Sequence, residues 1–117
     1  MKENILKEKS KSFAIRIVNL YKFLINEKKE FIMSKQLIRS GTSIGANLME
    51  AEYAQSNADF IHKNSIALKE ANETKYWLEL LFETEYLSKE QYESIKSDCE
   101  ELLKILIATI KKLKNKQ

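Results

Sequence analysis

Very few side chains in this sequence could carry out chemistry. The chain has one histidine, His62, and one cysteine, Cys99. A carboxylate-bridged di-metal site between helices needs two Glu-x-x-His pairs and two further glutamates, whereas the residue three before His62 is Asp59. Cys99 falls in a hydrophobic repeat with no second histidine to act as a base, which is typical of a buried, unreactive thiol. We therefore expect no enzymatic activity, no metal and no cofactor.

Polar residues that interrupt the apolar repeats predict a structural network instead. In the stretch LKEANETKYWLELL, Glu70 and Glu73 are three residues apart and share a helical face. Arg39 is a possible partner for one of them, and buried polar groups of this kind are best known for fixing the register of packed helices. Tyr76 and Trp77 could stack on nucleic-acid bases, but a core or interface position is the more frequent role of such a tryptophan. The predicted network consists of Arg39, Asn47, Glu50, Glu70 and Glu73.

The elements that must position these residues are all helical. The chain has no proline and only two glycines, and its apolar residues recur at helical spacing in four segments. The expected N-terminal caps are Ser34, then Ser56 or Asn57, then Ser88 with Gln91 in a capping box. The four predicted helices run from about residue 5 or 12 to 26, from 35 to about 53, from just after Ser56 or Asn57 to the TEYLS stretch at 84–88, and from there to about 113. Short connections predict one all-α domain over residues 1–117, an up-down-up-down antiparallel four-helix bundle.

Both glycines fall in the second predicted helix, one turn apart at Gly41 and Gly45. A glycine within a helix costs about 1 kcal/mol relative to alanine. We therefore expect Gly41, Gly45 and the adjacent Ala46 to let a neighbouring helix pack closely. The other interpretation is a phosphate-binding loop, but no Gly-Lys-Ser/Thr follows and no strand precedes these glycines.

The net charge of +3 is unevenly distributed along the chain. Residues 1–40 carry ten Lys/Arg against four Asp/Glu, residues 41–100 carry five against twelve, and residues 101–117 carry five against one. In an up-down-up-down bundle the chain starts and finishes at the same end, so the two basic segments should meet there. Clustered basic charge is typical of nucleic-acid binding, although solvated lysine tails are equally common at chain ends. The predicted contact residues are Lys2, Lys7, Lys9, Lys11, Lys111, Lys112, Lys114 and Lys116.

The chain also has more apolar residues than one buried seam per helix requires. A stable monomer rarely exposes a large apolar patch, so we expect a symmetric homo-oligomer. Residues 1–9 contain no apolar signal region and no apolar run is long enough to span a membrane. With a single cysteine, these features predict a cytoplasmic protein without a membrane partner. The surplus apolar residues are Ile15, Val18, Phe23 and Ile25 in the first helix and Leu103, Ile105, Ile107 and Ile110 in the fourth.

Three segments carry a resemblance to a known family. In their order and spacing, SKQLIRSGTSIGANLMEA, ALKEANETKYWLELL and EYLSKEQY resemble the four-helix-bundle family of bacterial 23S ribosomal RNA intervening-sequence proteins. The similarity extends from about residue 12 to residue 113. The family name records where some of its genes lie, inside insertions in ribosomal RNA genes, rather than an activity. The matching motif positions are Arg39, Ser40, Gly41, Ser43, Ile44, Gly45, Ala46, Asn47, Glu50, Ala51, Ala67, Glu70, Glu73, Trp77 and Leu78.

The resemblance has implications for assembly and partners. Members of the family resemble the accessory variability determinant of diversity-generating retroelements, a barrel of five bundles that binds nucleic acid and a reverse transcriptase. On this resemblance we expect a non-enzymatic homo-oligomer, with five as the implied number of subunits, that associates with RNA or DNA. The alternative expectation is an oligomeric scaffold or adaptor that binds a protein partner.

Overall fold

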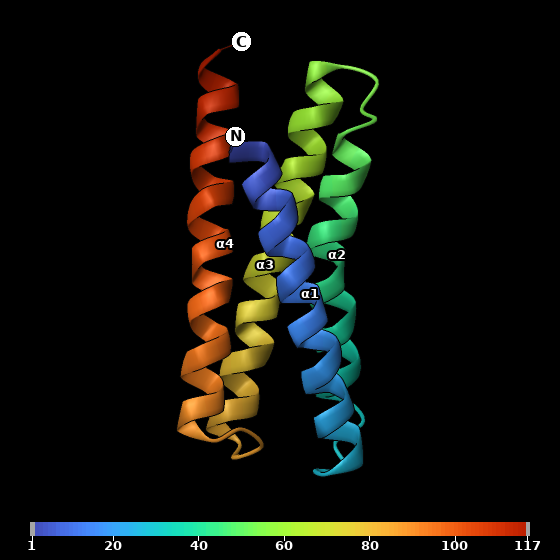
Figure 1. The fold of residues 1–117 in the computed structure, drawn as a ribbon, viewed down its shortest axis with the longest axis vertical. Coiled ribbons are helices and arrows are strands. Elements are labelled where there is room, and N and C mark those ends of the chain that lie inside the picture. Colours follow the sequence, from blue (N-terminus) through green and yellow to red (C-terminus); the bar gives the residue numbers. More distant parts are fainter. Residues whose placement is uncertain (1, 117) are drawn as a thin grey trace.

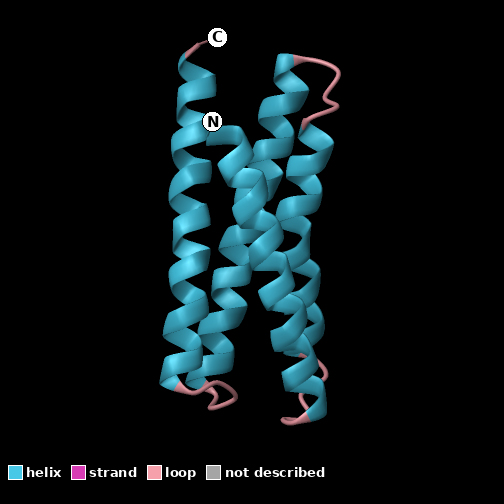
Figure 2. Cartoon of the chain, in the orientation of Figure 1, coloured by secondary structure: helices cyan, strands magenta, loops and turns pink. Residues whose placement is uncertain are grey.

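Four α-helices joined by short loops make up the fold. The computed structural model describes the backbone of residues 2–116 and the side chains of residues 5–116. The helices are α1 (Lys2–Asn26), α2 (Met33–Ala51), α3 (Asn57–Glu83) and α4 (Lys89–Asn115). Successive helices run in opposite directions (Figure 1), and Figure 2 shows only helices and loops over the described residues. The predicted all-α, up-down-up-down four-helix bundle is confirmed.

The helices form a ring in which each packs against two neighbours. α2 packs closely against α1 and α3, and α4 against α3 and α1, whereas over the described residues the backbones of the diagonal pairs stay farther apart. α1 lies close to α4 near its N-terminal end and diverges from it towards the other end of the bundle (Figure 1). Arg16 links α1 to α4, since its Nη1 lies 2.6 Å from Asp98 Oδ2 and its Nη2 lies 2.9 Å from Ser94 Oγ.

The core consists of the apolar residues that recur at helical spacing. α1 buries Phe13, Ile17 and Leu24, and α2 buries Leu37 and Ile44. α3 and α4 bury both small and large side chains. The buried residues of these two helices include Ala67, Ala71, Leu78, Leu81, Tyr92, Ile95, Leu102 and Leu106. The apolar residues that recur at helical spacing in each segment therefore face the bundle interior, as the 3.6-residue period requires.

The N-terminal caps agree with the sequence for two helices and disagree for one. Ser56 caps α3, and Ser88 with Gln91 forms the capping box of α4. Ser34 is not a cap, because it lies inside α2 and is fully buried. The carboxylate of Glu30 takes this role: it accepts hydrogen bonds from the backbone N–H groups of Ile32, Met33 and Ser34 at 3.2, 2.9 and 2.7 Å.

Part of the surplus apolar surface is already buried within one chain. Leu103 and Ile110 are only 8% and 7% exposed, so they belong to the core rather than to a surface between subunits. Ile15 and Ile107 remain more than half exposed, at 54% and 53%. The apolar surface that α1 and α4 offer to another subunit is therefore smaller than the sequence suggested.

Candidate functional site

The start of α1 and the finish of α4 lie at the same end of the bundle, as expected (Figure 1). We call this the basic end. Lys111, Lys112, Lys114 and Lys116 are exposed there, on the last turns of α4, and within the described residues none of them forms an ion pair. These four ammonium groups are therefore available to an anionic ligand.

The α1 lysines contribute less to the basic end than predicted. Lys7 forms an ion pair with Glu52 at the C-terminal end of α2, and Lys9 pairs with Glu101 of α4 at 3.1 Å. Lys11 is exposed, but nine residues of helix place it about 14 Å along α1 from Lys2. The side chain of Lys2 lies outside the described residues. The basic end is thus formed mainly by α4.

Carboxylates near the basic end are largely neutralised by neighbouring groups. Lys63 lies 2.7 Å from Glu50, and this hydrogen bond, together with the negative charge of Glu50, raises the pKa of the Lys63 ammonium above its usual value. Glu52 is held by Lys7, and Asp59 lies in the first turn of α3, where the helix dipole favours a negative charge. Glu8, in the second turn of α1, is exposed and forms no ion pair among the described residues, so it is the carboxylate at this end that stays unpaired.

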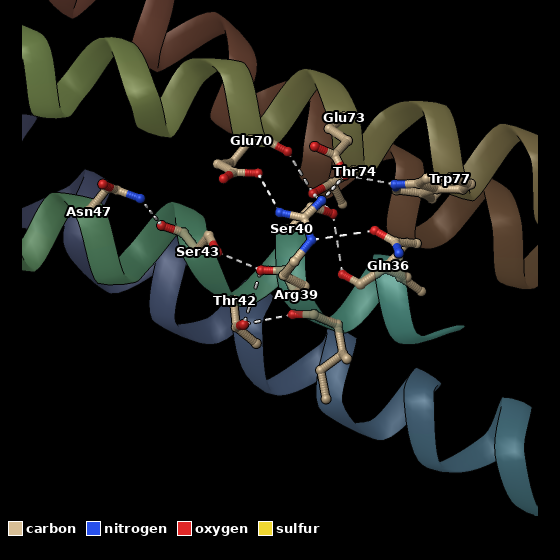
Figure 3. Close-up of polar contacts among 12 residues, drawn as sticks. Gln36, Arg39, Ser40, Thr42, Ser43, Asn47, Glu70, Glu73, Thr74 and Trp77 are labelled. Carbon is tan, nitrogen blue, oxygen red and sulfur yellow. Dashed lines mark hydrogen bonds and ion pairs between the residues drawn. The ribbon is translucent and has the colours of Figure 1, made fainter. Parts of the chain in front are cut away.

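A polar cluster joins α2 to α3 near the middle of the bundle (Figure 3). Arg39 of α2 donates to both Glu70, at 3.4 Å, and Glu73. The indole Nε1 of Trp77 donates to Glu73 Oε2 at 3.0 Å, and Arg39 Nε donates to Gln36 Oε1 at 3.4 Å. One guanidinium therefore spans two helices, which supports the structural role predicted for these residues.

A pair of buried hydroxyl groups lies beneath this cluster. Thr74 Oγ1 is 2.9 Å from Ser40 Oγ and 2.8 Å from the carbonyl oxygen of Glu70, and both hydroxyl residues are fully buried. A hydrogen bond between two helices in the core fixes their relative height. This pair was not expected from the sequence, although two small hydroxyl residues at buried positions of adjacent helices are a recognisable signal.

The other two members of the predicted network lie apart from this cluster. Asn47 Nδ2 donates to the carbonyl oxygen of Ser43 within α2, and Glu50 pairs with Lys63. Within the described residues, neither bonds to Arg39, Glu70 or Glu73. The five residues thus form separate local contacts rather than one network.

Gly41 and Gly45 face α1. A Cβ atom at Gly41 would lie 2.8 Å from both Cγ1 and Cγ2 of Ile17, which is closer than carbon atoms pack. A Cβ atom at Gly45 would lie 3.4 Å from Ser10 Oγ, an ordinary contact. The close helix approach that the sequence predicts is therefore present, and it is tightest at Gly41. Ala46 is exposed and takes no part in it.

Cys99 and His62, the two side chains considered for catalysis, differ in exposure. Cys99 is fully buried, its Sγ is 3.5 Å from the carbonyl oxygen of Ala71, and desolvation raises the pKa of its thiol to about 12. His62 is exposed on α3. Among the described residues, no three His, Cys, Asp or Glu side chains gather as metal ligands would. The thiol thus stays protonated near neutral pH.

These observations define the class of protein as a four-helix bundle. Polar groups connect its helices, and four lysines are exposed at one end of it. Residues 2–108 match the 23S rRNA-intervening sequence protein family, and the chain belongs to that family. The expected family membership is therefore confirmed.

A solved structure supports the same assignment. The chain is 69% identical to a protein of unknown function from the S23 ribosomal protein family of Bacteroides thetaiotaomicron, with a TM-score of 0.93. The match covers 95% of this chain and 99% of that one. No curated protein matches the chain. Within residues 2–116, no helix has both the length and the apolar character that a membrane span requires.

Proposed function

We propose that this chain is a non-enzymatic, cytoplasmic protein that assembles with copies of itself and binds RNA or another nucleic acid through the basic end. The observation that carries the proposal is the group of four exposed, unpaired lysines on the last turns of α4, at positions 111, 112, 114 and 116. A homo-oligomer repeats this group in every subunit, and five subunits is the number implied by the family resemblance.

The expected binding is electrostatic and independent of base sequence. Lysine ammonium groups contact phosphates, and each phosphate that they neutralise releases condensed counterions. Affinity should therefore fall steeply between about 50 and 200 mM salt. The buried thiol of Cys99 and the isolated His62 supply no site for cleavage, so bound RNA should stay intact.

Fluorescence anisotropy with a labelled RNA tests this proposal. Changing Lys111, Lys112, Lys114 and Lys116 to Glu should abolish binding while helicity and oligomer size stay unchanged. The pair Lys111→Glu and Lys112→Glu should lower the salt slope by about two, one for each lost phosphate contact.

The matched control reverses two exposed lysines away from the basic end, Lys69→Glu and Lys89→Glu, and should leave the salt slope nearly unchanged. Wild-type protein that shows no salt-dependent binding near 50 mM salt would refute the proposal. Equal binding by the wild type and the variant with all four α4 lysines reversed would also refute it.

A protein partner is the second candidate, favoured by two exposed side chains at the end of α2. Met49 and Tyr53 are 62% and 82% exposed, and both residue types are enriched where proteins meet. A photo-crosslinking amino acid at position 53 should then attach one defined protein in a native lysate, and Met49→Lys should prevent the attachment. RNA crosslinked at that position would favour the first candidate instead.

A further inference from the structure

The two halves of the bundle differ in charge. Residues 1–52, which contain α1 and α2, carry ten Lys/Arg against six Asp/Glu, whereas residues 53–110, which contain α3 and most of α4, carry six against eleven. Because α1 and α2 are neighbours in the ring, as are α3 and α4, this difference along the chain becomes a difference between two opposite sides of the bundle. The lysines of the basic end follow residue 110, so they are not counted in this difference between the two sides.

The contrast is sharpest at the end of the bundle opposite the basic end, where the α1–α2 and α3–α4 loops lie (Figure 1, lower right and lower left). We define the lysine edge as Lys22, Lys28, Lys29 and Lys35, and the glutamate edge as Glu79, Glu83, Glu85, Glu90 and Glu93. Glu27 and Lys89 are the exposed residues of opposite sign on the respective edges, and Glu30 of the α1–α2 loop is buried.

Among the described residues, these charges form no ion pair within their own chain. The seven ion pairs among the described residues involve none of the lysines or glutamates of the two edges. All of them are exposed except Glu79, which is half-buried. By contrast, Lys7, Lys9 and Arg16 of the same α1 helix all pair with a carboxylate of their own chain.

The lysine edge also presents two large apolar side chains. Phe31 and Ile32, in the α1–α2 loop, are 61% and 79% exposed. The loop has a defined shape, because the buried Glu30 carboxylate binds three of its following backbone N–H groups. Two exposed apolar residues on a fixed loop, beside unpaired lysines, are typical of the anchor of a protein interface.

We propose that the lysine edge of one subunit docks on the glutamate edge of the next subunit, with Phe31 and Ile32 buried in that contact. This inference rests on the self-assembly in the proposed function and names its interface. Two copies that stand side by side in the same direction bring the two loop regions to the same height, so the opposite charges meet. The contact is heterologous, because a two-fold dimer would place lysine edge on lysine edge or glutamate edge on glutamate edge.

A second copy fits this surface better than an anionic partner does. An anionic membrane would attract the lysine edge, but it would repel the glutamate edge at the same end of the bundle. A nucleic acid would meet the same repulsion. Only a partner with both signs of charge at matching heights satisfies both edges, and this chain is such a partner.

Light scattering coupled to gel filtration, at several salt concentrations, tests the interface by charge exchange. Lys28→Glu with Lys29→Glu should dissociate the oligomer, and Glu83→Lys with Glu85→Lys should do the same. Each raises the dissociation constant at least about tenfold, because like charges then meet. All four substitutions in one chain should restore the oligomer, because the two edges then carry opposite charges again. Phe31→Ser with Ile32→Ser should weaken it at least about tenfold.

The matched control is Lys111→Glu with Lys112→Glu, which changes the net charge equally at the opposite end and should leave the oligomer intact. If both loop double variants assemble like the wild type, or the fourfold variant stays dissociated, this interface is wrong while self-assembly still holds. If the wild type is a monomer at micromolar concentration, both self-assembly and the interface fail. RNA binding by that monomer would separately uphold the nucleic-acid part of the proposed function.

Discussion

The contact between Gly41 and Ile17 decides whether the substitution Gly41→Ala raises or lowers the stability of the protein. Gly41→Ala should improve helix propensity by about 1 kcal/mol. The new methyl group, however, would lie 2.8 Å from both γ carbons of Ile17, about 0.7 Å closer than carbon atoms pack. Rotation of Ile17 about χ1 does not help, because any rotamer leaves at least one γ carbon in one of these two positions. The helices must therefore separate, which costs about 1–3 kcal/mol.

Gly45→Ala is the matched control for this substitution. Gly45 lies one turn further along α2, and its change to alanine gains the same helix propensity. The new methyl group, however, would lie 3.4 Å from Ser10 Oγ. We therefore expect Gly45→Ala to stabilise the protein by about 1 kcal/mol and Gly41→Ala to destabilise it by up to about 2 kcal/mol. Gly45→Leu, which is too large for the site, should cost about 1–3 kcal/mol.

Urea unfolding followed by far-UV circular dichroism measures these differences. All variants should be compared at one protein concentration, because self-assembly adds to apparent stability. In an Ile17→Ala background, which removes both γ carbons, Gly41→Ala should no longer destabilise. Equal stabilisation by Gly41→Ala and Gly45→Ala in the wild-type background would show that the close approach has no energetic weight.

Three further predictions concern the loops and the core. Glu30→Ala leaves three backbone N–H groups at the start of α2 without their acceptor, so it should lower the free energy of unfolding by about 1–3 kcal/mol, and an unchanged urea midpoint would contradict the capping role. Lys29 and Glu85 have φ values of 53° and 67°, so glycine at either position should raise the stability by about 1 kcal/mol, whereas a loss would contradict the left-handed geometry. Because burial raises the pKa of Cys99 to about 12, the thiol ionises first in the unfolded state, and stability should fall as pH rises from about 9 towards 12, by up to about 1.4 kcal/mol per pH unit. Cys99→Ala should lack this part of the pH dependence, and a wild type with the same slope as the variant would refute the argument.

Local signals were sufficient for most of the fold and insufficient for the polar contacts. Hydrophobic period and serine caps predict four helices, and the seams they define are the buried faces. The cap of α2 was misplaced, because the carboxylate of Glu30 reaches its N–H groups only after the chain has turned back at Lys29. The α1–α2 contact at Gly41 could be expected from residue size, but its partner Ile17 could not be named.

By itself, the sequence determined which face of each helix is buried, because a 3.6-residue period depends only on the order of residues along one segment. It also determined that the chain carries clustered lysines and a thiol without a base. The tertiary structure decided which charges remain free. Lys7 and Lys9 are paired because α2 and α4 bring Glu52 and Glu101 beside α1, whereas no acidic side chain among residues 5–116 forms an ion pair with the last four lysines of α4. Such pairings depend on the relative height and rotation of the helices, which are set by contacts between residues far apart in the chain.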